Sequence, residues 1–210
     1  LGVIGQSMAL SEEKIAGVDE AGRGPLAGPV VAAAVILPQS HSIHGLADSK
    51  ALSVRARERI YQTIIEHHMV VWSVAVVEAA VIDEINILQA TLQAMRQAVM
   101  QLCKVPSAVW VDGRDCPDVP MECRAIVKGD QCVEAISAAS IVAKVTRDRL
   151  MGEYAEQYPQ YGLMQHKGYG TKQHLQALKT YGPSPIHRRS YRPVMEAMRA
   201  HDMSEVAHGS

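Results

Sequence analysis

Apolar runs mark several short strands in the first part of the chain. Residues 15–18 and 30–37 are apolar and rich in β-branched or small side chains, and a stretch rich in glycine and proline separates them. Two such runs around turn residues predict adjacent strands that start as a hairpin. Residues 69–77 are rich in valine, which favours a third strand.

Helical periodicity follows these strands. Ser53 is placed to cap a helix that carries an isoleucine stripe. Further on, leucine, methionine and valine recur every three or four residues, and we expect those methionines to fill the core. A later segment carries an alanine face that would allow close packing on a sheet. The predicted helices span residues 53–68, 87–103, 132–158, 171–181 and 194–200.

Two more short strands lead into acidic residues. Residues 108–111 are followed by Asp112, and residues 124–127 are followed closely by Asp130. Strands that alternate with helices predict an α/β fold, a mixed sheet flanked by helices with a small helical C-terminal extension. The expected organisation is a leader at 1–13, the α/β domain at 14–160, a basic helical extension at 161–200 and a flexible tail at 201–210.

Composition excludes several classes of protein. The 210 residues are 48% hydrophobic and 20% charged with a net charge of −1, which argues against disorder. Residues 29–38 form the longest apolar stretch, too short for a membrane span. We therefore expect a soluble, cytoplasmic protein, with its four cysteines reduced and buried. Residues 165–199 carry seven lysines and arginines against one glutamate, a net +6, so the chain ends in a basic lobe.

Four carboxylates are predicted to lie at one rim of the sheet. Asp19 and Glu20 close the first strand, and Asp112 and Asp130 follow two later ones. Carboxylates gathered there would repel one another unless cations held them together. Magnesium prefers oxygen ligands of this kind, and paired metal ions support phosphoryl chemistry. The pattern predicts phosphodiester hydrolysis, although each acid taken singly is also a common turn residue.

The adjacent pair at the first strand poses a difficulty. Neighbouring residues in a regular strand point to opposite faces, so Asp19 and Glu20 face one metal only if the strand ends there. Gly22 and Gly24 permit such an ending because glycine adopts backbone angles that other residues avoid.

The stretch from Asp19 to Pro29, Asp-Glu-Ala-Gly-Arg-Gly-Pro-Leu-Ala-Gly-Pro, resembles the N-terminal motif of ribonuclease HII. Further blocks in family order support the resemblance, which covers residues 15–194. They are Asp48-Ser49-Lys50, Val111-Asp112-Gly113, Val127 to Asp130, Ser137 to Asp148, His166-Lys167-Gly168-Tyr169 and His187 to Ser190.

The resemblance implies roles for individual residues. Asp19, Glu20, Asp112 and Asp130 match the family's catalytic acids, which bind magnesium or manganese, with two ions expected in the substrate complex. It further implies that Gly22, Arg23 and Gly24 read the RNA-to-DNA junction through backbone groups, and that Tyr169 stacks on the following deoxyribose. Lys50, Arg188 and Arg189 are expected to bind substrate phosphates.

The implied enzyme is a metal-dependent endonuclease of the ribonuclease H fold. It is expected to cut 5′ of a ribonucleotide, in RNA/DNA hybrids and at single ribonucleotides in duplex DNA, leaving 3′-hydroxyl and 5′-phosphate ends. A monomer is assumed by default. Two alternatives remain: the related ribonuclease HIII family, which resembles Gly-Lys-Gly where this chain has Gly22-Arg23-Gly24 and carries an extra N-terminal domain, and a hybrid-binding module without catalysis.

Three residues of the long helix are harder to assign. Asp148 is expected to pair with a basic neighbour. Ser140 and Lys144 share a helix face at i and i+4, where a place near the cleft competes with packing among the alanines, which we favour. An isolated basic residue such as Arg147 or Lys167 is expected at the surface more often than on a phosphate.

Overall fold

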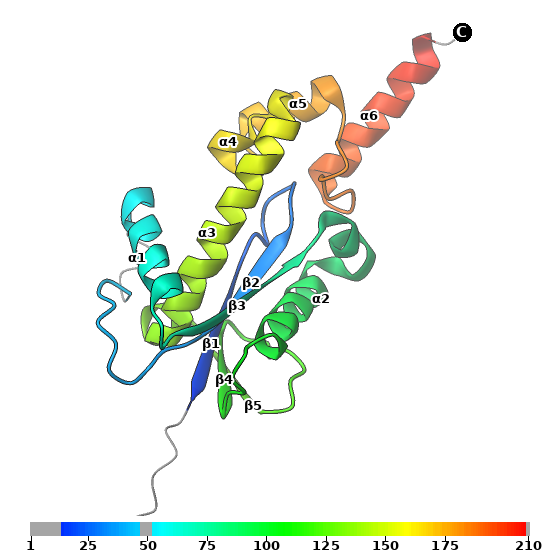
Figure 1. The fold of residues 1–210 in the computed structure, drawn as a ribbon. Helices are drawn as coiled ribbons and strands as arrows, with labels where there is room; N and C mark the ends of the chain where they lie inside the picture. Colours follow the sequence, from blue (N-terminus) through cyan, green and yellow to red (C-terminus); the bar gives the residue numbers. More distant parts are fainter. Residues whose placement is uncertain (1–13, 47–51, 209–210) are drawn as a thin grey trace, which may run out of the picture.

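A mixed five-stranded sheet forms the centre of the protein in a computed structural model that describes residues 14–46 and 52–208 (Figure 1). The strand order is β3-β2-β1-β4-β5, with β1 antiparallel to β2, β2 antiparallel to β3, and β1, β4 and β5 parallel. The strands are β1 (Ile15–Ala21), β2 (Val30–Ile36), β3 (Val71–Val77), β4 (Ala108–Asp112) and β5 (Glu122–Ile126). The predicted hairpin and mixed sheet are therefore confirmed.

Six α-helices accompany this sheet in the described part of the chain. They are α1 (Val54–Glu66), α2 (Ala79–Met100), α3 (Glu134–Gln157), α4 (Leu163–His166), α5 (Lys172–Tyr181) and α6 (Arg192–His208), with short 3-10 turns η2 (Gly129–Gln131) and η3 (Pro159–Tyr161). Ser53 caps α1 as predicted, through its side chain on the Ala56 amide.

Two predicted helices are longer than their periodicity suggested. α2 begins at Ala79 and is kinked at Asn86, which has a φ of 68°, so the sequence pattern captured only the part after the kink. α6 continues to His208, through most of the segment expected to be a flexible tail. The leader expected at 1–13 lies outside the described residues.

Helices cover both faces of the sheet. α2 packs on one face, while α3 and α1 lie on the other (Figure 1). Every residue of β2 is buried because its side chains alternate between the two layers: Ala32 and Ala34 join the α2 side, and Ala33 and Val35 the α3 side. Small residues there let both helices approach closely.

The closest approach is between β1 and the start of α3. A Cβ atom added at Gly17 would lie 2.1 Å from the backbone carbon of Ala135 and 2.2 Å from the backbone nitrogen of Ile136. Of the alanine face predicted for this helix, Ala138, Ala139 and Ala143 are fully buried and Ala135 is partly buried. This contact fixes α3 against the strand that carries the first two acids.

The C-terminal helices form a third apolar cluster beyond the end of the sheet (Figure 1). Leu26 and Ala27, from the β1–β2 loop, are part of it. The Leu26 amide donates to the Gly168 carbonyl at 2.8 Å, and the Arg188 amide donates to the Leu26 carbonyl at 2.9 Å. The extension is therefore joined to the loop that follows the first two acids.

Composition predicted that no segment spans a membrane and that the four cysteines are reduced and buried, and the structure bears on both predictions. No helix in the described residues is long and apolar enough to cross a membrane. All four cysteines are free thiols, but Cys103, Cys116 and Cys132 are exposed and Cys123 is half-buried, so the prediction that they are buried was wrong. Cys103, Cys116 and Cys132 lie in loops or at a helix end, whereas Cys123 lies on the outermost strand β5, where it packs only partly against the core.

Candidate active site

Three parallel strands end at the same edge of the sheet and bring the predicted acids to it. Val18 pairs with Val111, so Asp19 on β1 and Asp112 on β4 come next along neighbouring strands. Asp112 in turn pairs with Ile126 at the end of β5. The carboxyl ends of parallel strands are where open α/β sheets place their binding sites.

The first strand does not end where its acids begin. β1 continues to Ala21, and Asp19 and Glu20 pair regularly with Ala33 and Ala32 of β2. The chain turns only at Gly22, which has a φ of +102°. The expectation that the strand stops at the two acids was therefore wrong, because the hairpin pairing with β2 extends through them.

Asp130 reaches the same end of the sheet from a different element. It lies in η2, just after β5, and is 2% exposed. Lys128 reverses the chain ahead of it with a φ of 58°. η2 packs against β4 and the start of α3, which places Asp130 at the strand end that holds Asp112.

The acids at this edge influence one another electrostatically. Burial raises the pKa of Asp19 well above its ordinary value, and the charges of Glu20 and Asp112 raise it further, against an opposing hydrogen bond from Ser140. Burial also raises the pKa of Glu20, an effect that nearby Arg23 opposes and Asp112 reinforces. The folded chain therefore disfavours the ionised forms of Asp19 and Glu20 in the absence of a cation.

The donor chemistry of the cluster fits a hard divalent cation. Within the described residues, Oδ1 of Asp112 is buried and has no hydrogen-bond partner. Carboxylate oxygens are the ligands that magnesium and manganese prefer. No three carboxylate, histidine or cysteine side chains in the described residues already lie close enough to hold a metal ion together. The acids are thus gathered at one edge without a closed coordination shell.

A cavity of about 370 Å³ opens beside the acids. Glu20 and the Gly22–Gly24 loop line one side, and Ser140 and Lys144 of α3 line another. The favoured interpretation that Ser140 and Lys144 only pack among alanines was wrong, because the helix face that they share borders the cavity. Their i, i+4 spacing showed that they share a face, but not what that face meets. Tyr169 completes the lining from the C-terminal extension.

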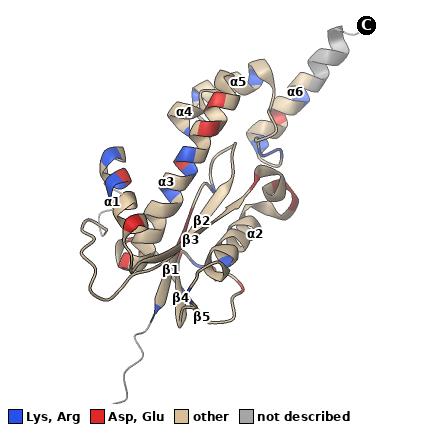
Figure 2. Ribbon diagram, in the orientation of Figure 1, with Lys and Arg blue, Asp and Glu red and all other residues tan. Residues whose placement is uncertain are grey.

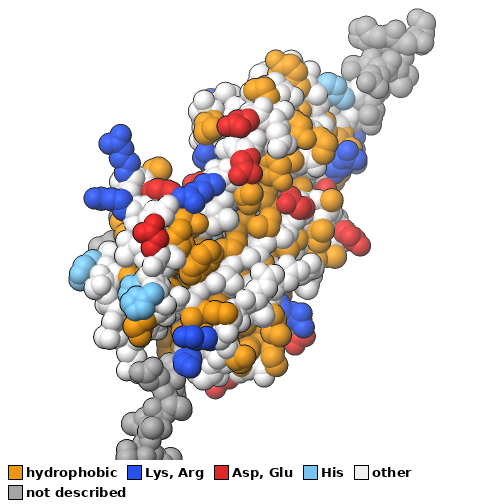
Figure 3. Space-filling model, viewed as in Figure 1, with side chains coloured by type: hydrophobic (Ala, Val, Ile, Leu, Met, Phe, Trp, Pro, Cys, Tyr) orange, Lys and Arg blue, Asp and Glu red, His pale blue; other side chains and the backbone are white. Residues whose placement is uncertain are grey.

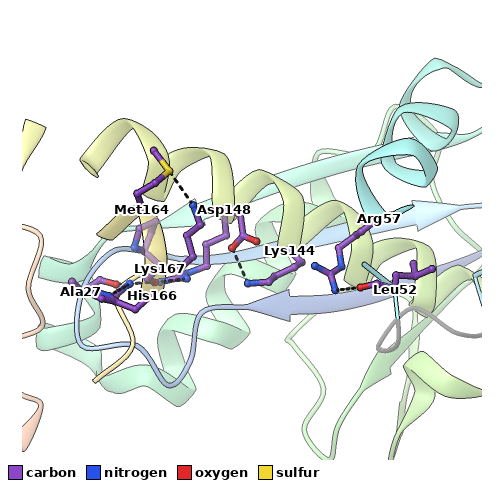
Figure 4. A network of polar contacts seen from close by, with 11 residues as sticks. Ala27, Leu52, Arg57, Lys144, Asp148, Met164, His166 and Lys167 are labelled. Carbon is purple, nitrogen blue, oxygen red and sulfur yellow. Dashed lines mark hydrogen bonds and ion pairs between the residues drawn. The ribbon is translucent and has the colours of Figure 1, made fainter. Parts of the chain in front are cut away.

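Cationic side chains surround this cavity. Arg23, Arg57 and Lys144 line it, and Lys144 Nζ lies 2.7 Å from Oδ1 of Asp148 (Figure 4). This ion pair confirms the partner expected for Asp148. Arg57 Nη2 donates to the Leu52 carbonyl at 3.1 Å. Further Lys and Arg residues lie on α1 and α3, and some project from the α1 side of the molecule (Figures 2 and 3).

Tyr169 lies next to the glycine loop although almost 150 residues separate them. A Cβ atom built at Gly24 would lie 3.6 Å from Cε1 of Tyr169. The tyrosine is 46% exposed, so its ring can still meet a ligand. The structure thus brings together the two segments that the family resemblance singles out for junction reading.

The three basic residues expected on phosphates lie in different surroundings. Arg188 is fully buried, and its guanidinium donates to the carbonyls of Gly22, Arg23 and Gly28, so its cation supports the loop from behind. Arg189 is exposed, and its amide donates to Asp83 at 2.8 Å. Lys50 lies outside the described residues.

Arg147 was also expected at the surface, but it is 1% exposed. It donates to the carbonyls of Ala27, Pro29 and Lys167. Only a tertiary arrangement that gathers these carbonyls could bury such a side chain.

Comparison with known proteins identifies the family of this chain. The family model for ribonuclease HII matches residues 16–194. The chain belongs to the ribonuclease HII family. It is 56% identical to a ribonuclease HII of Coxiella burnetii (strain Dugway 5J108-111) over 182 residues, 87% of this chain and 90% of that one. It is 53% identical to a ribonuclease HII of Nitrosococcus oceani over 194 residues, 92% of this chain and 96% of that one.

Solved structures give the same result. The ribonuclease H2 of Pyrococcus horikoshii OT3 matches with a TM-score of 0.74 and 30% identity over 89% of this chain and 97% of that one. A Bst-RNase HIII in complex with Mn²⁺ shares the fold, with a TM-score of 0.74 at 19% identity over 92% of this chain and 72% of that one. The predicted fold class and family are therefore confirmed, and the protein is an endoribonuclease.

Proposed function

We propose that this enzyme hydrolyses the phosphodiester on the 5′ side of a ribonucleotide in RNA/DNA hybrids and at single ribonucleotides in duplex DNA. The products would carry 3′-hydroxyl and 5′-phosphate ends. One observation carries the proposal: a single cavity is lined by Glu20 of the acid cluster, by the Gly22–Gly24 loop and by Tyr169. Chemistry and ribose recognition would therefore act on adjacent groups of one substrate.

Asp19, Glu20, Asp112 and Asp130 are the residues that would hold divalent metal, magnesium or manganese, with two ions in the substrate complex. Bound there, such ions supply charge neutralisation at the phosphate and a lowered pKa for the attacking water. The carboxylates provide oxygen ligands on rigid strand ends, and α3 packed against Gly17 holds β1 in place. The raised pKa values of Asp19 and Glu20 favour a metal-bound over a metal-free ionised cluster.

Recognition of the ribonucleotide is assigned to the Gly22–Gly24 loop and Tyr169. The 2′-hydroxyl distinguishes RNA from DNA, and a glycine-flanked backbone allows close approach to it. The exposed ring of Tyr169 lies next to Gly24 and would stack on the sugar that follows. Selectivity would thus depend on two contacts on either side of one junction.

Affinity would come from the cations around the cavity. Arg23, Arg57 and Lys144 line it. Arg189, the residue after the buried Arg188, is exposed to solvent. Such residues bind phosphates independently of base sequence, and their contribution falls as salt rises. We further expect a cytoplasmic monomer whose partners are hybrid duplexes and DNA containing ribonucleotides.

The decisive experiment is cleavage of an end-labelled DNA duplex that contains one ribonucleotide, in magnesium, in manganese and in chelator, with the product ends mapped. We expect a metal-dependent cut on the 5′ side of the ribonucleotide. Asp19→Asn should abolish it, whereas Arg96→Lys, an exposed change on α2, should not. Cleavage restricted to tracts of several ribonucleotides would contradict the junction-reading role of Tyr169, and binding without cleavage in any metal would contradict the catalytic assignment.

A further inference from the structure

Two fully buried arginines lie behind the Gly22–Gly24 loop without a salt-bridge partner among the described residues. Arg188 is 0% and Arg147 is 1% exposed, and neither forms a salt bridge with any residue that the structure describes. A buried cation without a counter-ion costs several kcal/mol unless its donors are satisfied. Main-chain carbonyls satisfy them here, which suggests that the arginines serve the loop whose carbonyls they hold.

Arg188 binds the same side of two consecutive peptide groups. Its Nη1 donates to the Arg23 carbonyl at 2.9 Å and its Nη2 to the Gly22 carbonyl. The hydroxyl of Tyr191 donates to the Arg23 carbonyl as well, at 2.6 Å, and accepts from Arg188 Nη1 at 3.0 Å. Both carbonyls therefore point inward, toward Arg188.

Because the peptide group is planar, the direction of each carbonyl fixes the direction of the amide N–H that follows it. In a trans peptide the N–H points away from its C=O, and all described peptide bonds are trans. The amides that follow the two held carbonyls belong to Arg23 and Gly24, so they point away from the buried guanidinium. Neither amide has an acceptor among the described residues, and both residues line the cavity.

Arg147 ties this loop to the one that carries Tyr169. Its Nε donates to the Pro29 carbonyl at 3.0 Å, and its Nη1 donates to the Lys167 carbonyl at 3.1 Å, two residues before the tyrosine. A Cβ at Gly22 would lie 2.2 Å from its Nε, so the side chain also packs directly under the turn. The two halves of the recognition surface are thus connected through one buried cation.

We infer that Arg188 is a positioning residue that aims and polarises the Arg23 and Gly24 amides as donors toward the ribose 2′-hydroxyl and the adjacent phosphate. A cation bound to the carbonyl end of a peptide group strengthens its N–H as a donor. Arg147 holds Tyr169 in register with those amides. This inference rests on the proposed function, because it explains how the same loop distinguishes RNA from DNA.

The test compares the affinity of two fluorescent duplexes of identical sequence, one with a single ribonucleotide and one entirely of DNA, in chelator so that neither is cut. The measured quantity is the dissociation constant of the all-DNA duplex divided by that of the duplex with the ribonucleotide, so a high ratio means strong discrimination. Arg188→Lys keeps the charge but cannot reach three carbonyls, and we expect it to lower the ratio about tenfold. Arg96→Lys is the matched control, since this exposed arginine also donates to a main-chain carbonyl, that of Asp118, and it should leave the ratio unchanged.

Tyr191→Phe is the milder variant, because it removes only one hydroxyl from the same network. We expect the ratio to fall about threefold, and this variant alone decides the matter if thermal unfolding shows that Arg188→Lys is not folded. Folded variants that keep the wild-type ratio would overturn the inference and leave the proposed function intact. A wild-type protein that binds both duplexes equally would instead refute the proposed junction reading.

Discussion

The buried histidine network of the C-terminal extension should make the enzyme less stable as the pH falls from 6.5 toward 4. His187 is 1% exposed; its Nδ1 accepts from the Ser184 amide at 3.0 Å, and its Nε2 lies 3.0 Å from Nε2 of His174. His174 Nδ1 in turn lies 3.0 Å from the Tyr169 carbonyl. These partners are all satisfied when both rings are neutral, with His187 donating to His174 and His174 donating to Tyr169.

Protonation of His187 would direct the N–H of Nδ1 at the Ser184 amide N–H, although the Ser184 hydroxyl at 2.8 Å could accept from it, and would place a charge beside the imidazoles of His174 and His166. Burial first, and then His174 and His166, lower the pKa of His187 from 6.5 to about 4. Between these values the unfolded chain binds the proton and the folded chain does not, so stability declines as pH falls. The loss is about 2 kcal/mol at pH 5 and about 3 kcal/mol at pH 4 relative to neutral pH. Burial also lowers the pKa of His174, which acts in the same direction.

Urea unfolding followed by circular dichroism at pH 7.5, 6 and 5 measures this loss. Carboxylates also titrate in this range, so the quantity to compare is the pH dependence of wild type against that of His187→Asn, whose side-chain oxygen can still accept from the Ser184 amide. The variant should be less stable at pH 7.5 but should lose about 2 kcal/mol less on going to pH 5. Equal losses in the two proteins would refute the assignment of a neutral, buried His187.

Four other substitutions test the site and the fold. Asp19→Asn should abolish cleavage while the metal-free protein melts no lower than wild type, because the change removes a buried charge that burial and neighbouring acids disfavour; a lower melting temperature would contradict this. Gly17→Ala should destabilise the protein by about 3 kcal/mol or more in urea unfolding, since the added Cβ would lie 2.1 Å from the backbone of Ala135. Tyr169→Ala should reduce cleavage at a single embedded ribonucleotide more than in a long hybrid, and an equal loss on both would argue against junction reading. Lys144→Ala should weaken duplex binding equally with and without a ribonucleotide and lower the salt dependence by about one phosphate contact, measured by titration at several salt concentrations.

Local sequence patterns determined most of the secondary structure and the acids of the site. Valine-rich runs, the Ser53 cap and the alanine face of α3 act within a few residues, so periodicity and capping predict them. The acids were found because a carboxylate that follows an apolar strand is visible in sequence alone. Where a local pattern was interrupted, as at Asn86 in α2, prediction lost part of the element.

Only the tertiary structure decided which polar residues serve the site from inside the protein. The sequence predicted Arg147 at the surface and Arg188 on a substrate phosphate, but both are buried because carbonyls of residues 22–29, 118 to 166 residues away, converge on them. Ser140 and Lys144 line the cavity because α3 presents its alanines to the sheet and thereby turns the neighbouring helix face to the cleft. The environment of a long polar side chain depends on segments distant in the sequence, and therefore no local pattern could predict it.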